Sequence, residues 1–344
     1  MGFSEILDKL IYHGDLSSEE AERALQLIIS GKVEDERVAG FLTGMRMKGE
    51  TIEELTAFVK VMREASIKPE VEVNGAIDLC GTGGDSSGTF NISTASMFVV
   101  AGAGVPVLKH GNRSVSSKSG SADVLEVLGG VVDLHKEQVE QVFEEIGLVF
   151  MFAPNFHPAM KHVMKARRTL GIRTFFNILG PLLNPAGVQR QMIGAYSKDI
   201  AWKIARILAN LDTDFAYTLN AHDGLDEVSL NAQTEIFELN RKLVKKATTF
   251  DPRSLGFDWV EMEDLQGGDA ETNAEIIRSI MAGKAKEAQR NIILLNATFG
   301  IHAAGKVDHL TEAKELAEES LDSGAAQKAL EQYVEATNEA ALEE

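Results

Sequence analysis

Cysteine is almost absent from this chain, which has Cys80 as its single cysteine among 344 residues. One thiol excludes an internal disulfide and agrees with a reducing cytoplasm. Because Cys80 stands at the end of an apolar run, we interpret it as a small buried hydrophobic residue and not as a nucleophile. The chain has no apolar run of about eighteen residues, and its N-terminus has neither a signal peptide nor a myristoylation pattern. We therefore expect a cytoplasmic protein without a membrane segment.

Basic residues are scarce relative to acidic ones, with 34 Lys and Arg against 52 Asp and Glu and a net charge of -18. So negative a surface repels phosphate backbones, which argues against nucleic acid as a partner.

Acidic residues are themselves missing from two long segments, residues 146–198 and residues 104–122. Seven cations fall in the first segment: Lys161, Lys165, Arg167, Arg168, Arg173, Arg190 and Lys198. The second segment holds Lys109, Arg113 and Lys118. Chance clustering on solvated helix faces is the alternative, but we expect these segments to receive a small anion.

The hydrophobic pattern divides the chain into two parts. Residues 3–66 have helical periodicity, with capping boxes at Ser17/Glu20 and at Thr51/Glu54, and Pro69 follows them. Short apolar runs then alternate with amphipathic helices, which is typical of crossover connections in a parallel sheet. The sequence predicts an α/β protein, with a small N-terminal α-helical domain at residues 1–68 and a large α/β domain with a mainly parallel central sheet at residues 72–344.

The stretch "DLCGTGGDSSGTFNIST", residues 78–94, follows the first predicted strand. Parallel sheets bind ligands at the carboxyl ends of their strands, and glycines let peptide N–H groups approach an anion closely. A helix begins near Ser93 and Thr94, and its unpaired N–H groups favour phosphate. A merely flexible turn is the alternative. Neither the dinucleotide fingerprint nor the P-loop pattern fits, because Ser86 and Ser116 replace the required glycines.

Longer motifs resemble the anthranilate phosphoribosyltransferase family. "GTGGD", "NIST", "KHGNR", "SGSADVLE", "RTLGIRTFFNILGPLLNP" and "GLDE" occur in the order and approximate spacing of that family. The resemblance implies a large domain of the nucleoside-phosphorylase type and a homodimer that forms through the N-terminal helices. A helical segment near 158–170 is expected to be part of the same N-terminal helical domain. It also implies transfer of phosphoribose from phosphoribosyl pyrophosphate (PRPP) to the amine of anthranilate, with Mg²⁺, in tryptophan biosynthesis. An anthranilate synthase component is a possible partner.

The resemblance also assigns the site residue by residue. The residues expected to bind PRPP are Gly81, Gly84, Asp85, Thr89, Asn91, Ile92, Ser93, Thr94, Lys109, His110, Gly111, Asn112, Arg113, Ser117 and Ser121. Those expected to bind anthranilate are Gly81, Asn112, Arg167, His157 and Pro181. Those expected to bind Mg²⁺ are Ser93, Asp226 and Glu227. Ser121 is expected to be the N-cap of its helix, which would hold a further phosphate.

The chemistry of the side chains supports some of these assignments and leaves others open. The fork of Arg167 can pair with a carboxylate in two bonds, although motif position alone separates it from Arg168. Asp226 and Glu227 supply hard oxygen ligands, whereas an Asp-Glu pair judged by composition is usually a solvated face. His157 and Pro181 could equally be structural. We expect Lys109 and Ser93 to stabilise the leaving diphosphate electrostatically, without a general acid or base.

Three other interpretations remain open from the sequence. A pyrimidine nucleoside phosphorylase would use the same type of fold with inorganic phosphate. A non-catalytic relative would bind nucleic acid, which the charge of -18 disfavours. A substituted benzoate could also replace anthranilate as the acceptor.

Overall fold

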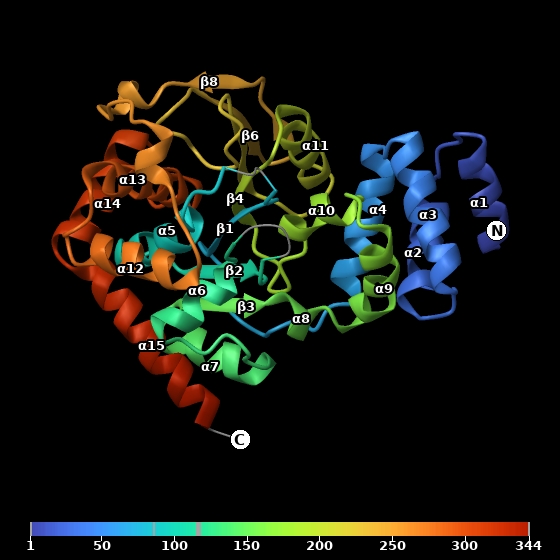
Figure 1. Cartoon of the computed structure of the whole chain (residues 1–344), viewed down its shortest axis with the longest axis horizontal. Helices are drawn as coiled ribbons and strands as arrows, with labels where there is room; N and C mark the ends of the chain where they lie inside the picture. The colour runs from blue at the N-terminus through green and yellow to red at the C-terminus, as the bar shows by residue number, and fades with distance from the viewer. Residues whose placement is uncertain (1, 85–86, 115–117, 343–344) are drawn as a thin grey trace.

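Four helices form a separate unit at the N-terminus of the computed structural model, which describes residues 2–84, 87–114 and 118–342. They are α1 (Phe3–Ile11), α2 (Ser18–Ile29), α3 (Asp35–Lys48) and α4 (Ile52–Glu64). The side chains of Ser17 and Thr51 accept hydrogen bonds from the backbone N–H groups of Glu20 and Glu54. Both predicted capping boxes are therefore confirmed. Figure 1 shows the unit at one end of the molecule.

A helix from the middle of the chain completes this unit. α9 (Lys161–Leu170) packs against α2 and α3, although it follows the third strand of the sheet. Phe175, just beyond α9, lies with its ring centroid 4.5 Å from that of Phe58 and 6.3 Å from that of Phe41. The core of the helical unit thus contains side chains from two distant parts of the sequence. Figure 1 shows α9 beside the N-terminal helices.

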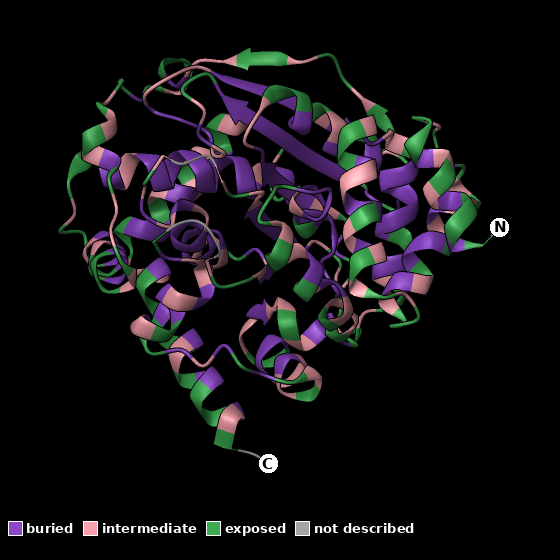
Figure 2. Cartoon of the chain, turned by 45° about the vertical axis from the view of Figure 1, so that its right-hand side comes forward, coloured by how far each residue is buried: buried purple, intermediate pink, exposed green. Residues whose placement is uncertain are grey.

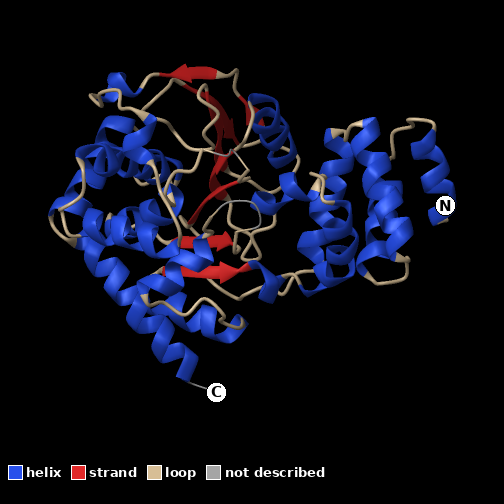
Figure 3. Cartoon of the chain, viewed as in Figure 1, coloured by secondary structure: helices blue, strands red, loops and turns tan. Residues whose placement is uncertain are grey.

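The second part of the chain is built on an eight-stranded sheet, in which β3, β2, β1, β4 and β5 lie parallel in that order. These strands are β1 (Ile77–Gly81), β2 (Val107–Gly111), β3 (Leu148–Phe152), β4 (Arg190–Gly194) and β5 (Phe215–Ala221). An antiparallel edge follows, made of β6 (Thr234–Asn240), β7 (Leu243–Val244) and β8 (Thr248–Phe250). The predicted α/β fold class with a mainly parallel sheet is confirmed, whereas the antiparallel edge was not predicted. Figure 3 shows helices on both sides of the central strands, whereas β8 lies at the rim of the molecule.

Helices cover both faces of the sheet. The longer ones are α5 (Ile92–Gly102), α6 (Ser121–Leu128), α7 (Lys136–Ile146), α11 (Lys198–Leu208), α12 (Ala270–Met281), α13 (Glu287–Ala303), α14 (Leu310–Asp322) and α15 (Ala325–Leu342). Single turns complete the chain at α8 (Ala153–Phe156), α10 (Phe176–Leu179), Pro158–Met160, Gly180–Leu182, Pro252–Leu255 and Met262–Leu265. None of the described helices combines the length and apolar composition that crossing a bilayer requires.

Alternate side chains of the strands enter two different cores. Leu79 and Met192 pack with α5 and α13 on one face, whereas Cys80 and Ile193 join α11 and the helical unit on the other. This is the period-two alternation of a strand buried on both faces. Cys80 is buried, as predicted. Figure 2 shows the buried residues concentrated in the sheet and in the helix faces that contact it.

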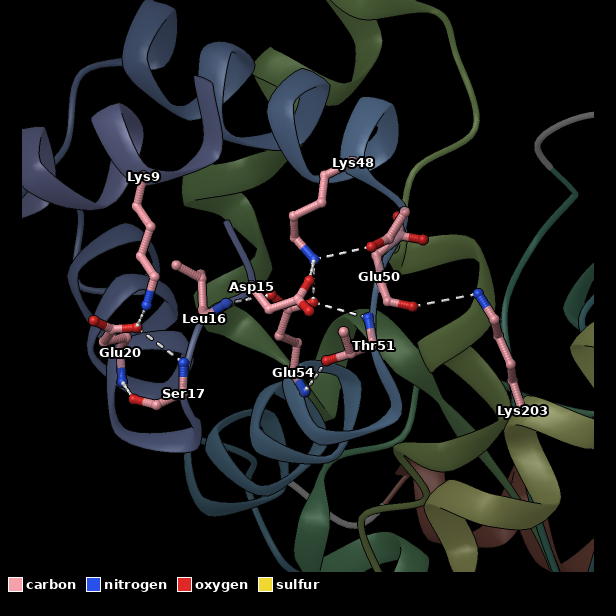
Figure 4. Close-up of polar contacts among 11 residues, drawn as sticks. Lys9, Asp15, Leu16, Ser17, Glu20, Lys48, Glu50, Thr51, Glu54 and Lys203 are labelled. Carbon is pink, nitrogen blue, oxygen red and sulfur yellow. Dashed lines mark hydrogen bonds and ion pairs between the residues drawn. The ribbon is translucent and has the colours of Figure 1, made fainter. Parts of the chain in front are cut away.

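A buried ion pair organises the turns of the helical unit (Figure 4). The carboxylate of Glu54 accepts hydrogen bonds from the N–H groups of Leu16 at 2.7 Å and Thr51 at 2.8 Å, and from Lys48 Nζ at 2.8 Å. The side chains of Glu54 and Lys48 are 0% and 2% exposed. One carboxylate therefore connects the end of α3, the start of α4 and the segment before α2.

We expect Glu54→Ala to lower the free energy of unfolding by about 1 to 3 kcal/mol, because the N–H groups of Leu16 and Thr51 lose their buried acceptor, whereas Lys48 keeps its ion pair with Asp15 at 2.8 Å. Urea unfolding of the full chain measures this effect. Glu53→Ala is the matched control, since the Glu53 carboxylate lies on the exposed side of the same turn and bonds only to Ser18 among the described residues. Equal losses in the two variants would contradict the prediction.

Candidate active site

The loops that follow β1, β4 and β5 meet at the carboxyl edge of the sheet. The N–H of Gly83, after β1, donates to Asp226 Oδ2 at 2.8 Å. The N–H of Thr82 donates to the carbonyl of Gly194 at 2.9 Å. Asp226 lies in the loop between β5 and β6, so two hydrogen bonds connect the ends of three adjacent strands.

Two glycines make this close approach possible. A Cβ atom at Gly81 would lie 2.5 Å from Asp226 Oδ2, and one at Gly194 would lie 1.5 Å from the Asp226 carbonyl oxygen. Gly83 and Gly84 have φ angles of 65° and 77°, which side-chain-bearing residues rarely adopt. The "GTGG" motif is thus needed both for the bend and for the space beside Asp226.

The N-terminus of α5 lies beside this bend. The helix starts at Ile92 after Asn91, close to the predicted start, and Glu227 Oε1 accepts a hydrogen bond from Ser93 N at 3.1 Å. An anion at this position is stabilised by unpaired N–H groups and by the helix dipole. Ser93 and Glu227 also line one small hollow together with Leu79 and Asn296.

Lys109 places a fixed positive charge below the same helix end. Its side chain rises from β2, is only 1% exposed, and donates from Nζ to the Leu79 carbonyl and to Ser93 Oγ, the latter at 3.4 Å. In a buried setting such a charge acts strongly on a bound anion, because solvent does not screen it.

Asp78 forms a second buried network beneath the site. Its carboxylate accepts hydrogen bonds from His110 N at 3.2 Å and from Asn184 Nδ2 at 2.9 Å. Burial raises the pKa of Asp78 to about 6, although the Lys109 ammonium and these hydrogen bonds oppose the shift. We did not predict a role for Asp78 or Asn184, although both stand inside quoted motifs, at the start of the glycine-rich stretch and in "LLNP".

Two neutral histidines face each other next to this network. The rings of His110 and His157 are 5.2 Å apart at 68°, and both residues are buried. His157 Nε2 lies 2.9 Å from the Leu183 carbonyl, which requires the proton on Nε2. His110 Nε2 and His157 Nδ1 have no hydrogen-bond partner among the described residues. Burial lowers the pKa of both rings, that of His157 to about 4.

The lowered pKa of His157 predicts a pH-dependent stability. As the pH falls, the unfolded chain takes up a proton at this histidine near pH 6.5 and the folded chain only near pH 4. The contribution of His157 is therefore complete above pH 6.5 and is lost toward pH 4, by about 3 kcal/mol in all. Urea unfolding should show a smaller loss between pH 7 and pH 4.5 in His157→Gln than in the unsubstituted protein. An equal loss in both would show that His157 takes up its proton normally when folded.

Arg167 lies on α9 with its guanidinium over an aromatic ring. It is half-buried, lies 5.2 Å from the Phe176 ring centroid, and forms no ion pair with any described residue. Burial lowers its pKa. Arg168 is exposed. Arg173 connects the segment after α9 to the glycine bend, donating from its guanidinium to the Gly84 carbonyl at 2.5 Å and lying over the ring of Tyr196.

Other predicted phosphate-binding residues lie between α5 and α6. Thr94 Oγ1 and Ser121 Oγ are 2.9 Å apart, and Asn91 Nδ2 donates to the Ser119 carbonyl. Ile92 is buried. Thr89 forms an isolated β-bridge with Gln266.

The loop after β2 holds the remaining predicted residues. Gly111 ends that strand, and a Cβ atom there would lie 2.7 Å from the Phe150 ring. Asn112 is exposed, and the Arg113 guanidinium pairs with Glu126 at 2.5 Å. Asp85 and Ser117 lie outside the described residues.

The predicted N-cap role of Ser121 is wrong. Gly120 occupies the N-cap position of α6, and Ser121 is the first helical residue. The carboxylate of Asp123 accepts hydrogen bonds from Gly120 N at 2.8 Å and Ser114 N at 3.1 Å. The capping interaction therefore comes from the third helical residue.

Magnesium fits the oxygen donors at the sheet edge. Asp226 and Glu227 offer two consecutive carboxylates, one bonded to the glycine bend and the other to Ser93 at the start of α5, and Mg²⁺ needs few protein ligands when phosphate oxygens and water complete its shell. No group of three His, Cys, Asp or Glu side chains suited to a metal occurs among residues 2–84, 87–114 and 118–342. Pro181 is buried, and its carbonyl accepts a hydrogen bond from Gln191.

Comparison with known proteins gives two family matches. Residues 4–66 match the helical bundle domain of the glycosyl transferase family, and residues 73–327 match its a/b domain. The chain is 49% identical to anthranilate phosphoribosyltransferase from Salinibacter ruber, over 97% of this chain and 98% of that one. It is 45% identical to the protein of that name from Petrotoga mobilis, over 98% and 97%.

Solved structures resemble the whole chain. The crystal structure of anthranilate phosphoribosyltransferase from Thermus thermophilus has a TM-score of 0.90 and 38% identity, covering 96% of this chain and 99% of that one. The enzyme from Saccharomyces cerevisiae in complex with PRPP and Mg has a TM-score of 0.89 and 28% identity, with 98% of both chains covered. Another structure of the yeast enzyme contains 4-fluoroanthranilate.

Proposed function

The chain belongs to the anthranilate phosphoribosyltransferases of the glycosyl transferase family, and on that premise we propose how its residues bind the two substrates. It transfers the 5-phosphoribosyl group of PRPP to the amine of anthranilate and releases pyrophosphate, a step of tryptophan biosynthesis. The observation that carries the assignment of residues is the meeting of Lys109, the α5 N-terminus and the glycine bend at one strand edge.

The diphosphate of PRPP binds between the glycine bend and the start of α5. Backbone N–H groups of this bend and helix end face the site, and Lys109 adds a buried positive charge. Thr94, Asn91 and Ser121 extend the polar surface toward α6.

Ser93, Asp226 and Glu227 would hold Mg²⁺, with phosphate oxygens of the donor as further ligands. When bound, the ion neutralises negative charge on the diphosphate. Both carboxylates accept hydrogen bonds from backbone N–H groups in the structure. When the donor binds, its phosphate oxygens replace the carboxylates as acceptors for these N–H groups. The carboxylates thereby keep the amides oriented toward the place where the anion binds.

Anthranilate binds between α9 and the loop after β2. Arg167 pairs with its carboxylate, because this guanidinium is half-buried and forms no ion pair with a described residue. Asn112 and the backbone at Gly81 contact the polar side of the acceptor, and His157 and Pro181 its ring.

The transfer itself depends on electrostatic stabilisation and positioning. Negative charge develops on the leaving diphosphate as its bond to the ribose breaks, and Lys109 and the Ser93 N–H lie where they stabilise that charge. The amine of anthranilate is neutral at pH 7, so orientation by Arg167 and Asn112 brings it to the ribose without a general base.

We expect Arg167→Ala to raise the KM for anthranilate about 10- to 100-fold, because it removes a charged hydrogen-bonding group, and to leave the KM for PRPP nearly unchanged. Lys109→Met keeps most of the buried apolar volume of the side chain but removes its charge. This variant should raise the KM for PRPP and lower kcat, and should leave the KM for anthranilate nearly unchanged. Loss of anthranilate fluorescence on mixing with PRPP and Mg²⁺ measures both variants. The exposed Arg168→Ala is the matched control. The reverse pattern would overturn these two assignments.

Two further assays address the alternative functions. Phosphate-dependent cleavage of thymidine or uridine in place of anthranilate turnover would indicate a pyrimidine nucleoside phosphorylase. Salt-sensitive DNA or RNA binding in a gel-shift titration, without turnover, would indicate a nucleic-acid-binding relative.

The N-terminal helices, residues 1–68 with the helical segment near 158–170, form the dimerisation domain, and residues 72–344 form the catalytic domain. Large apolar side chains at the ends of α1 and α3 support this assignment, because Ile11, Tyr12 and Met47 are 69%, 84% and 72% exposed. A cytoplasmic location and association with an anthranilate synthase component belong to the same proposal.

We expect Tyr12→Glu to convert a dimer into monomers in size-exclusion chromatography with light scattering, because it introduces charge into an apolar contact. Leu243→Glu is the matched control, since Leu243 is 65% exposed on the α/β domain. A monomeric unsubstituted protein, or a Tyr12→Glu variant that remains dimeric, would contradict an interface at this position.

A further inference from the structure

Asn296 is a buried amide at the centre of an apolar helix. It lies in α13, is 1% exposed, and stands between fully buried residues, with Leu294 and Leu295 before it and Ala297 after it. Burying an amide in such surroundings is unfavourable unless its polar atoms form hydrogen bonds. The contacts of this side chain therefore show what it does in the fold.

Both polar atoms of Asn296 bind the backbone of a single residue in another element. Asn296 Oδ1 accepts from Val228 N at 2.9 Å, and Asn296 Nδ2 donates to the Val228 carbonyl at 2.9 Å. Nδ2 also donates to the Ile292 carbonyl one turn earlier in α13, which fixes the orientation of the amide. The side chain thus holds the Val228 backbone as a neighbouring strand would.

Val228 directly follows Glu227, so this clamp lies next to one of the proposed metal-binding carboxylates. Asn296, Glu227 and Ser93 line the same hollow at the carboxyl edge of the sheet. α13 packs against β1, β4, β5 and α5, which are the elements that carry the glycine bend and the helix end. The hydrogen bonds between Asn296 and Val228 therefore hold the loop that carries Glu227 against α13, the helix that also packs against the other elements of the site.

The loop beyond Val228 is fastened by its own side chains. Ser229 Oγ donates to Asp223 Oδ2 at 2.7 Å, and Ser229 N donates to Thr234 Oγ1 at 3.1 Å. These contacts shape the loop locally but do not connect it to α5. Asn296 supplies a connection to the core at the residue next to Glu227.

We propose that Asn296 is a positioning residue for Mg²⁺ and PRPP. By holding Val228 it fixes the Glu227 carboxylate beside Ser93 N, where donor and metal are to bind. This proposal rests on the metal assignment of Glu227 made above. Groups that orient metal-ligating side chains typically change metal affinity about 10- to 100-fold when they are removed.

Isothermal titration calorimetry with PRPP at fixed Mg²⁺ concentrations tests the proposal without depending on turnover. We expect Asn296→Ala to weaken PRPP binding about tenfold and to raise the Mg²⁺ concentration needed for half-saturation, since the carboxylate is no longer held in place. The KM for anthranilate should change less than about twofold. Asn296→Ser, which keeps a small polar side chain, is the second variant if Asn296→Ala does not fold.

Thr298→Val is the matched control for stability. Thr298 is buried in the same helix, and its hydroxyl bonds only to the Leu294 carbonyl among the described residues. This variant removes a buried side-chain hydrogen bond from the same helix and should retain PRPP and Mg²⁺ binding. The proposal is overturned if a folded Asn296 variant binds both like the unsubstituted protein, or if Thr298→Val weakens binding equally.

Glu227→Gln separates this proposal from the assignment on which it rests. If Glu227→Gln weakens Mg²⁺-dependent PRPP binding and the Asn296 variants do not, the metal assignment stands and the positioning role fails. If Glu227→Gln leaves that binding unchanged, both fail. The proposal is supported when both substitutions weaken binding and Thr298→Val does not.

Discussion

The hydrogen bonds from Gly83 N to Asp226 and from Ser93 N to Glu227 are the contacts on which the rest of the site depends. Two consecutive carboxylates bind peptide N–H groups from a bend and from a helix end that lie far away in the sequence. This arrangement needs glycine at positions 81 and 194, because any side chain there would occupy the place of Asp226. The same amides then suit an anion supplied by a substrate.

Two buried charged residues beneath the site, Lys109 and Asp78, stabilise the strand ends that make these contacts. Lys109 and Asp78 are both buried, and the Asp78 carboxylate joins the end of β2 to Asn184 in the segment before β4. The two buried charges of opposite sign lie in neighbouring hydrogen-bond networks, and each is tolerated because hydrogen bonds satisfy it. Together these networks leave little freedom to the strand ends that carry the site.

Local sequence signals predicted much of the fold. Apolar runs placed the parallel strands, and Ser17 and Thr51 placed two helix starts, because periodicity and capping are properties of a few neighbouring residues. The β6 to β8 edge was missed, since pairing direction depends on residues far apart. Ser121 was misjudged as an N-cap because a serine before an apolar run is a common cap, whereas here Asp123 caps the helix from inside.

The site was predictable where a motif carries it and not where distant contacts do. The glycine bend, Lys109 and Glu227 belong to motifs, and the structure places them together. Asn184 and Asn296 were not singled out, because their meaning depends on partners about a hundred and about seventy positions away. A polar residue inside an apolar helix is nevertheless a signal that could have pointed to Asn296.

The helical unit is discontinuous in sequence, because α9 and Phe175 fill a core that begins at Phe3. A fragment that stopped after α4 would present the unmatched apolar faces of α2 and α3 to water. Conversely, removing that fragment would strip the cover from α9 and from α11. The two units thus share one apolar cluster, so a cut in the chain after α4 would expose buried side chains on both sides of it.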